Sequence, residues 1–305
     1  MVGLPPLLDS YDQFILDLDG CVRVGDEPVP GSPEAIIALR GAGKRVAFAT
    51  NNSWHSGEDQ VRSLWALGIQ ASLGDMVTVG GAVQHLLAET LSGRSAFVIG
   101  SEALRRHVSD AGLRLVDGPE HAAEAEVVVV GGTDQVDYAQ LRDAALSARR
   151  GADLLATARD PTLPMPGGPW PGTGAIVAAI EVASGRTAEI VGKPSPRLME
   201  TAVDRLGEGR TLVIGDRLDS DVAAAGAAGL DAALVLSGPD TGCGPPSAWP
   251  LGRPPGAGAY TVTARSGKAE PPTRSPPGPG NPNRLRDPPV RRPRGRRPAA
   301  RRPPG

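Results

Sequence analysis

The stretch Phe14-Ile-Leu-Asp-Leu-Asp-Gly20 places two carboxylates and a glycine directly after a short apolar run. A continuous apolar run of this length, closed by turn residues, is typical of a buried strand. Asp17 and Asp19 would then lie at the carboxyl end of that strand. A second apolar run, residues 45–50, also ends in polar residues, with Thr50 followed by Asn51. Two neighbouring strands therefore deliver polar groups at comparable positions.

Strand-like and helix-like segments keep alternating along the chain. Ser32 and Pro33 mark a helix start, as the N-cap and the first helical residue. Further strands are expected at 96–99, 127–130, 153–157, 211–214 and 231–236, and helices at 57–67, 83–89, 103–111, 138–149, 175–183, 196–206 and 221–228. This alternation predicts an α/β fold built on a doubly wound, Rossmann-like parallel sheet.

Ligands of open parallel sheets collect beyond the carboxyl ends of the strands. Four stretches bring polar groups to that edge: Asp17 and Asp19; Thr50 and Asn51; Lys193; and Asp216, Asp219 and Asp221. Carboxylates, a lysine and a hydroxyl together suit a phosphate held beside a hard divalent cation. Mg²⁺ in particular prefers oxygen ligands and usually takes one or two carboxylates plus phosphate and water.

These four stretches resemble, in order, the four motifs of the haloacid dehalogenase (HAD) superfamily of phosphohydrolases, beginning with its DxDG signature. The variants Asn51-Asn-Ser53, Gly192-Lys-Pro194 and Gly215-Asp-Arg-Leu218 are similar to those of the NagD-like, p-nitrophenylphosphatase-like branch. The resemblance covers about residues 10–238. It implies a core domain of residues 1–80 and 186–238, with an inserted α/β cap domain of residues 81–185.

The resemblance implies a two-step hydrolysis carried by the first motif. Asp17 would attack phosphorus and form an aspartyl-phosphate. An ordinary carboxyl pKa of ~3.9 would leave Asp17 ionised at neutral pH, so that no base need activate it. Asp19 would protonate the leaving group and then deprotonate the attacking water. Cys21 is interpreted as a small buried residue and not as a catalytic thiol.

The other motifs would bind the metal ion and the phosphate. Mg²⁺ would be held by the Asp17 carboxylate, the Asp19 backbone carbonyl and the Asp216 carboxylate. The resemblance assigns the phosphoryl oxygens to the Thr50 hydroxyl, the Asn51 backbone N–H and the Lys193 ammonium group. Asp221, and with it Asp219, would lie behind Asp216 and hold it in place.

In this branch the cap covers the core site and selects the leaving group. Thr157-Ala-Arg-Asp160 resembles a Thr-Asn-x-Asp segment of the family, with Ala158 where asparagine is usual. Arg159 and Asp160 are therefore candidates for contacting the leaving group. The implied partner is a small phosphorylated metabolite such as glycerol phosphate or phosphoglycolate, while pyridoxal phosphate and nucleoside monophosphates stay open. A homodimer formed through the cap is also open.

Two other functions compete with this one. A capped phosphate-binding or regulatory protein could keep the fold without turnover, although binding alone does not need a second acid such as Asp19. The basic C-terminal stretch could bind nucleic acid or another acidic partner through its Arg clusters. That stretch lacks interleaved aromatic residues, so nucleic acid is not the partner we expect.

The composition changes sharply near residue 239. The 305-residue chain has a formal net charge of −2, but residues 239–305 hold 13 basic and 3 acidic residues and 18 of the 31 prolines. No periodic pattern continues there, so this stretch is expected to be a disordered tail. Arg, Pro, Gly and Ala have GC-rich codons, which suggests the hypothesis that the stretch is a frameshifted extension replacing a final helix and strand.

Several classes of protein are excluded by what the sequence lacks. Two distant cysteines, Cys21 and Cys243, support neither a disulfide framework nor a cysteine-based zinc site. No apolar run reaches the ~18–20 residues that a membrane span needs. Residues 1–12 do not have the pattern of a secretory signal. A cytoplasmic protein without a membrane partner is expected.

Overall fold

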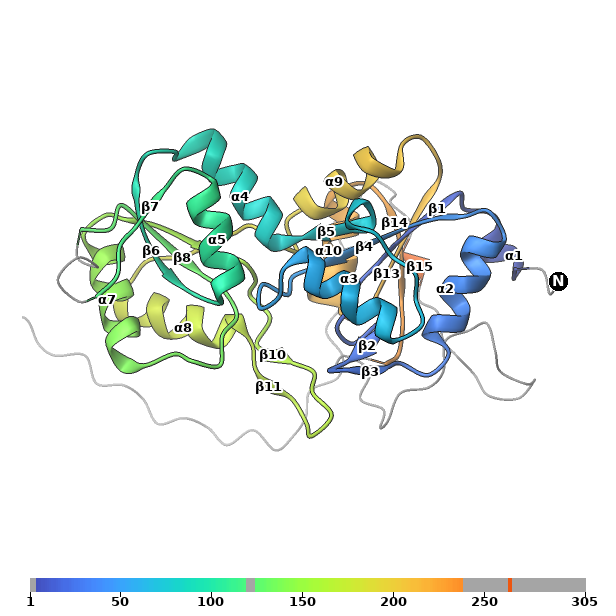
Figure 1. The fold of residues 1–305 in the computed structure, drawn as a ribbon, viewed down its shortest axis with the longest axis horizontal. Coiled ribbons are helices and arrows are strands. Elements are labelled where there is room, and N and C mark those ends of the chain that lie inside the picture. The colour runs from blue at the N-terminus through green and yellow to red at the C-terminus, as the bar shows by residue number, and fades with distance from the viewer. Residues whose placement is uncertain (1–3, 119–123, 238–262, 265–305) are drawn as a thin grey trace, which may run out of the picture. The chain divides into compact units, whose positions relative to one another are not determined.

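The computed structural model describes residues 4–118, 124–237 and 263–264, and its strands form two main parallel sheets (Figure 1). The six-stranded sheet has the order β15-β14-β13-β1-β4-β5. Its strands are β1 (Gln13–Leu16), β4 (Arg45–Thr50), β5 (Met76–Thr78), β13 (Thr211–Gly215), β14 (Asp231–Leu234) and β15 (Thr263–Ala264). All its neighbours are parallel except β14 and β15, which pair antiparallel.

The central strand β1 has a register that aligns the ends of its neighbours. Leu16 lies opposite Ile214 of β13 and opposite Phe48 of β4. The chain leaves β1 toward β4 on one side and returns to β13 on the other, which makes a topological switch point at the end of β1. In sheets of this kind ligands bind at such a point.

Alternate residues of these strands pack on opposite faces of the sheet. Ile15 and Val213 pack with helices α9 (Arg197–Leu206) and α10 (Ala223–Ala227), while Phe14 and Leu16 pack with α2 (Ser32–Gly41) and α3 (Gly57–Ala66). Because both faces are covered, β1 is buried along its whole length. The short elements here are α1 (Pro6–Asp9), β2 (Arg23–Val24), β3 (Glu27–Pro28), the 3₁₀ turn η1 (Leu73–Asp75) and the π-helical turn η2 (Leu218–Val222).

The five-stranded sheet has the order β12-β9-β8-β6-β7 and is parallel throughout. Its strands are β6 (Ser95–Ile99), β7 (Arg114–Leu115), β8 (Val127–Val130), β9 (Asp153–Ala156) and β12 (Glu189–Ile190). One face packs against α7 (Tyr138–Arg149) and α8 (Thr173–Ser184), the other against α4 (Val79–Thr90) and α5 (Glu102–Asp110). A hairpin of β10 (Thr162–Leu163) and β11 (Trp170–Pro171) precedes α8.

The predicted α/β class and doubly wound parallel sheet are confirmed, and the β-branched run Val127–Val130 is a fully buried strand as expected. Two short strands, β5 and β7, carry too few residues to show a pattern, and the sequence did not predict them. Within the stretch 239–305, Thr263–Ala264 form the unexpected edge strand β15. The other residues expected to form a disordered tail lie outside the described part of the chain.

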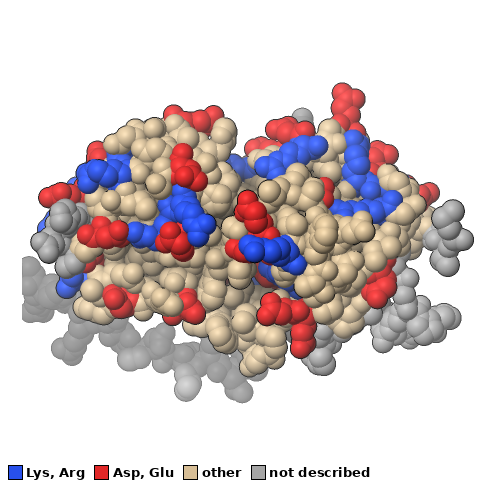
Figure 2. Space-filling view, in the orientation of Figure 1, with Lys and Arg blue, Asp and Glu red and all other residues tan. Residues whose placement is uncertain are grey.

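The surface and the helices add two further observations. No helix within the described ranges is long and apolar enough to cross a membrane. Acidic and basic side chains are interspersed over the face drawn in Figure 2, which therefore presents no broad basic area of the kind that binds a nucleic-acid backbone.

Candidate active site

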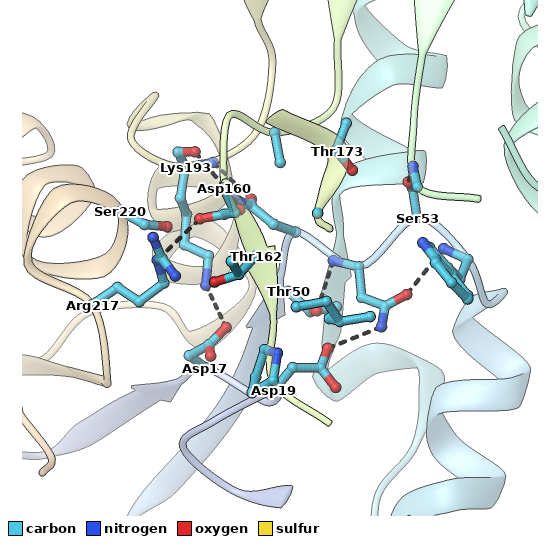
Figure 3. Close-up of a pocket in the computed structure, with 18 of the residues that line it drawn as sticks. Asp17, Asp19, Thr50, Ser53, Asp160, Thr162, Thr173, Lys193, Arg217 and Ser220 are labelled. Carbon is cyan, nitrogen blue, oxygen red and sulfur yellow. Dashed lines mark hydrogen bonds and ion pairs between the residues drawn. The ribbon is translucent and has the colours of Figure 1, made fainter. Parts of the chain in front are cut away.

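A pocket opens beyond the carboxyl ends of β1, β4 and β13, at the switch point of the six-stranded sheet (Figure 3). Residues that follow the strands of both sheets line it. From the loops of the six-stranded sheet and the segment after β12 come Asp17, Asp19, Thr50, Asn51, Asn52, Ser53, Trp54, Lys193, Arg217, Ser220 and Asp221; from the other connections come Gly132, Thr133, Ala158, Asp160, Thr162, Leu163, Pro164, Pro171, Gly172 and Thr173.

Lys193 forms the electrostatic centre of this pocket. Its ammonium group donates to an Asp17 carboxylate oxygen, to Asp221 Oδ1 at 2.6 Å and to the Ala49 carbonyl at 3.1 Å. The Lys193 side chain is only 3% exposed. Burial alone would lower the pKa of Lys193, but the two carboxylates outweigh burial, so this pKa lies above its ordinary value. Lys193 is therefore a fixed cation.

Burial raises the pKa of Asp17 to about 7, even though Lys193 lies against its carboxylate. The neighbouring charge of Asp221 adds to the rise. The expectation that Asp17 has an ordinary carboxyl pKa is therefore wrong for the buried environment that the fold creates. Water is excluded from a strand end that is covered on both faces. The apolar pattern of the sequence predicts a buried strand but not how far burial raises the pKa of Asp17.

Asp216 directly follows β13 and is not among the residues that line the pocket, and its carboxylate has no hydrogen-bond partner in the part of the chain that the structure describes. Both of its buried oxygens are unpaired among the described residues. Burial, together with the charges of Asp17 and Asp221, raises the pKa of Asp216 well above its ordinary value. A Cβ on Gly20 would lie 2.3 Å from Asp216 Oδ2, and Gly20 has a φ of +102°. Glycine at the end of the first motif is thus required both by backbone conformation and by the approach of Asp216.

The donor set fits a hard divalent cation. One carboxylate oxygen each from Asp17, Asp216 and Asp221 lies within 4.8 Å of the others, and all three residues are buried. One lysine cannot offset three carboxylates, and both oxygens of Asp216 remain free to coordinate. Oxygen ligands of this kind suit Mg²⁺. Asp221 was expected to lie behind Asp216, but its oxygen belongs to the same cluster.

Asn51 and Thr50 hold the pocket together through short polar contacts. The Asn51 amide donates to the Lys193 carbonyl at 3.0 Å, and its oxygen accepts from the Lys193 N–H at 2.8 Å. The same amide donates to Asp160 at 3.1 Å. Thr50 Oγ1 accepts from the Asn52 N–H at 3.0 Å. The segment after β4 is thereby tied to the segment after β12, which carries Lys193.

Asp19 also lines the pocket and has its own two partners. Arg23 Nε donates to Asp19 Oδ1 at 3.2 Å, and the Asn52 amide donates to Asp19 Oδ2 at 3.0 Å. The Asp19 side chain keeps 16% of its surface exposed. It therefore faces the pocket while each of its oxygens accepts one hydrogen bond.

Arg159 belongs to the segment 157–160 that was expected to contact the leaving group, and Arg217 pairs with the last residue of that segment. The two arginines have different environments. Arg159 forms two hydrogen bonds with Glu181 of α8, at 2.7 and 2.9 Å, and does not line the pocket. Arg217 instead pairs with Asp160 at 3.2 Å inside it. Burial raises the pKa of Asp160, and the Asn51 hydrogen bond and Arg217 oppose that rise. Of the two candidates for contacting a leaving group, the structure therefore brings Asp160 into the pocket and leaves Arg159 outside.

Two further expectations concern Asp219 and Cys21. The Asp219 side chain is 66% exposed and pairs with Arg217 at 3.3 Å, outside the carboxylate cluster. Cys21 is fully buried, in agreement with its interpretation as a packing residue. Arg217, Thr162 and Thr173 line the pocket without having been assigned a role from sequence. Arg217 stands inside the fourth motif, and this position was the only signal that could have identified it.

Carboxylates cluster around one lysine at the strand ends of a doubly wound parallel sheet. This arrangement defines the class of the protein as a hydrolase of phosphate esters, and comparisons with known families agree with this class. The profile of the haloacid dehalogenase-like hydrolases matches residues 14–114, and a HAD-hydrolase-like profile matches residues 190–243. Over 249 residues the chain is 38% identical to D-glycerol 3-phosphate phosphatase of Mycobacterium tuberculosis, covering 81% of this chain and 69% of that relative. The chain therefore belongs to the haloacid dehalogenase-like hydrolases and is a phosphomonoester hydrolase of the NagD-like branch.

Solved structures extend the comparison to the fold. The crystal structure of a glycerol phosphate phosphatase from Mycobacterium tuberculosis in complex with magnesium has a TM-score of 0.70 and 38% identity, over 78% of this chain and 71% of that one. NagD from E. coli K-12 has a TM-score of 0.66 and 29% identity, over 76% of this chain and 90% of that one. The resemblance to the NagD-like branch is thus confirmed along most of the described chain.

Proposed function

We propose that this chain is a Mg²⁺-dependent phosphatase that hydrolyses small phosphomonoesters through an aspartyl-phosphate on Asp17. The observation that carries the proposal is the pairing of Asp17 with the buried cation Lys193, next to the unpaired carboxylate of Asp216. A phosphate dianion would not enter a pocket in which carboxylates outnumber cations unless further positive charge were present. The division into a core of residues 1–80 and 186–238 and a cap of residues 81–185 belongs to the same proposal.

Asp17 acts as the nucleophile in this scheme. Its free oxygen attacks phosphorus, the bond between phosphorus and the leaving oxygen breaks, and the aspartyl-phosphate forms. Lys193 keeps the attacking carboxylate in place and opposes the effect of burial on its pKa, so that this pKa is raised only to about 7 and part of Asp17 stays ionised at neutral pH. Fixed positive charge near the transferred oxygens stabilises the transition state more than the ground state.

Asp19 supplies the proton transfers of both steps. It gives a proton to the leaving oxygen when the ester bond breaks, and it takes a proton from the water that attacks the aspartyl-phosphate. Its exposure to the pocket, at 16% of the side chain, supports both tasks. The products are an alcohol and inorganic phosphate, and the Asp17 carboxylate is regenerated.

Asp17, Asp216 and the Asp19 backbone carbonyl would hold Mg²⁺, with Asp221 in the same cluster. When bound, Mg²⁺ would neutralise phosphate charge and orient the ester for in-line attack. The Thr50 hydroxyl, the Asn51 backbone N–H and Lys193 would contact the phosphoryl oxygens. The side chain of Asn51 supports this arrangement, because its two hydrogen bonds to the Lys193 backbone fix that residue.

The leaving group is proposed to be a small neutral alcohol with hydroxyl groups, such as glycerol. The two cationic side chains known to line the pocket, Lys193 and Arg217, already have carboxylate partners. A carboxylate on the leaving group, as in phosphoglycolate, would therefore have to displace Asp160 from Arg217. Thr162 and Thr173 offer hydroxyls to a polyol instead. The Mycobacterium tuberculosis relative named for D-glycerol 3-phosphate agrees with this choice.

A panel of small phosphate esters, assayed for phosphate release with and without Mg²⁺, tests the proposal. We expect Mg²⁺-dependent release from glycerol phosphate and p-nitrophenyl phosphate, and slower release from phosphoglycolate. No release from any ester would refute the phosphatase, and faster release from phosphoglycolate would refute only the leaving-group assignment.

Two arginine variants test which arginine affects binding of the leaving group. Arg217→Ala leaves the buried Asp160 without its cation, so the KM for glycerol phosphate should rise by about 10-fold. Arg159→Ala is the matched control, because Arg159 bonds Glu181 outside the pocket, and its KM should change by less than about 3-fold. A larger rise of KM in the control variant would restore Arg159 as the residue that contacts the leaving group.

A further inference from the structure

Arg23 is a buried cation next to the active site that the proposed chemistry does not use. It lies in β2, only four residues beyond Asp19, and its side chain is 6% exposed. The backbone closes a tight loop here, since the Gly20 N–H donates to the Arg23 carbonyl at 2.7 Å. Arg23 is not among the residues that line the pocket, so a substrate would not reach its guanidinium group.

The guanidinium group of Arg23 connects Asp19 with helix α3. Its Nε donates to Asp19 Oδ1 at 3.2 Å, while its two terminal nitrogens donate to Gln60 and Ser63. Gln60 is itself 1% exposed. A planar guanidinium group with three fixed partners has little freedom to rotate, which distinguishes arginine from lysine at such a position.

Asp19 thus accepts one hydrogen bond at each carboxylate oxygen, from Arg23 on one side and from Asn52 on the other. Asp19 lies beyond the end of β1, where a bridge to Arg23 holds the backbone but leaves the Asp19 side chain to be oriented by its own partners. A group that transfers a proton to the leaving oxygen must be held close to its working position, because a displacement of ~1 Å can cost ~10²-fold in rate. The two donors supply that restraint.

We propose that Arg23 is a positioning residue for Asp19, which orients the carboxylate for proton transfer to the leaving group. The inference rests on the proposed function and adds to it a residue outside the four motifs. Arg23 affects catalysis only by orienting the Asp19 carboxylate, and helix α3 contributes by holding the Arg23 guanidinium group. The effect of losing Arg23 should therefore depend on how much protonation the leaving group requires.

The test compares an alkyl ester, glycerol phosphate, with p-nitrophenyl phosphate, whose leaving group needs little protonation. For Arg23→Met we expect the rate constant of leaving-group release in the first turnover, which precedes attack by water, to fall by about 10- to 100-fold with glycerol phosphate and by less than about 3-fold with p-nitrophenyl phosphate. Arg23→Lys keeps a charge that can reach Asp19 and should recover part of the loss. Asp19→Asn provides the reference for the same preference between the two esters.

Two further variants separate positioning from folding. Gln60→Ala removes a hydrogen-bond partner of Arg23 that acts on Asp19 only through Arg23. The rate on glycerol phosphate should therefore fall more than the rate on p-nitrophenyl phosphate, but by less than in Arg23→Met. This variant keeps the inference testable even if Arg23→Met does not fold. Arg40→Met is the matched control, because Arg40 pairs with Asp75 at 3.3 Å in the same sheet domain away from the pocket. Arg40→Met should change the rates on the two esters by the same factor.

The outcomes distinguish this inference from the proposed function. Wild-type turnover of p-nitrophenyl phosphate that is lost in Asp17→Asn supports the proposed function by itself. In an active enzyme, equal losses of the first-turnover rate constant on both esters in Arg23→Met and Gln60→Ala, or no loss on either ester, would overturn the role of Arg23. A loss confined to glycerol phosphate would support it.

Discussion

Replacing Lys193 with methionine removes the cation that two buried carboxylates share. The Nζ atom of Lys193 donates to Asp17, and to Asp221 at 2.6 Å, with 3% of the side chain exposed. Breaking a buried ion pair by deleting one partner costs about 3–5 kcal/mol, because a charge stays behind without compensation. In a domain of 150–250 residues this corresponds to a fall in Tm of roughly 6–20 °C.

Activity should fall for a second reason. An opposite charge within ~4–6 Å lowers a carboxyl pKa by roughly 1–3 pH units. Without Lys193, the pKa of Asp17 should rise above its value of about 7 by a similar amount. At pH 7 the ionised fraction of the nucleophile would then be roughly 0.1–10%. At limiting Mg²⁺, the loss of activity should therefore shrink as the pH of the assay is raised.

The assay is thermal and urea unfolding of the wild type, Lys193→Met and the control Lys44→Met, all at pH 7 with EDTA. Lys44 pairs with Asp9 at 3.5 Å, and the Asp9 side chain is 70% exposed. A surface pair of this kind contributes ~0–1 kcal/mol. If Lys193→Met lost no more stability than Lys44→Met, the electrostatic account of the pocket would be refuted.

Two other predictions concern the metal site. The pKa of Asp17, about 7 in the folded protein against 3.8 as its ordinary value, means that the folded state binds the extra proton; its contribution to stability is complete below pH ~4 and is lost as pH rises through ~7. Because Mg²⁺ needs the ionised carboxylates, it should raise Tm more at pH 8 than at pH 5, and equal rises would contradict this. Gly20→Ala should weaken Mg²⁺ binding and lower kcat by about 10-fold or more at limiting Mg²⁺, since its Cβ would lie 2.3 Å from Asp216 Oδ2. The control Gly43→Ala, with a φ of +76° and no heavy atom within 4 Å of the added carbon, should lose only stability; a matching loss of Mg²⁺ affinity in Gly43→Ala would refute the contact argument.

The residues at the strand ends could be predicted because each apolar run marks a buried strand and the polar residues that close the run mark its end. Asp17 follows β1 and Asp216 follows β13, and these neighbouring parallel strands bring their ends to one edge. Lys193 instead follows β12 of the five-stranded sheet, and its ammonium group reaches Asp17 and Asp221 from there. The alternation of strands and helices predicts the parallel sheet but not the order of its strands. The raised pKa of Asp17 did not follow, because it depends on how completely the surrounding chain excludes water.

The residues above the strand ends were harder to predict. Arg159 and Asp160 are adjacent in sequence, but Arg159 pairs with Glu181, which lies 22 residues further along in α8. Which of the two faces the pocket is decided by that pairing and by Arg217. Arg23 was missed for a similar reason, because its partners in α3 come into reach only when β2 folds back beside Asp19. Side-chain pairing between elements has no local sequence signal.

The frameshift hypothesis for residues 239–305 stays a prediction, and resequencing the gene around codon 239 tests it. The structure adds one constraint, since Thr263–Ala264 pair antiparallel with β14. A core strand contributed by the neighbouring reading frame would have to occupy the same edge. If no alternative frame encodes a helix and a strand for that edge, the hypothesis fails.

The central claim is that Asp17 carries the phosphoryl group during turnover. The most direct measurement is rapid acid quenching of the wild type and of Asp17→Asn with p-nitrophenyl phosphate and Mg²⁺, followed by mass analysis of the protein and assay of released phosphate. We predict a hydroxylamine-sensitive phosphoryl group on Asp17 in the wild type, and neither that group nor turnover in a folded Asp17→Asn. Retention of a large share of wild-type phosphate release by Asp17→Asn would contradict the covalent mechanism.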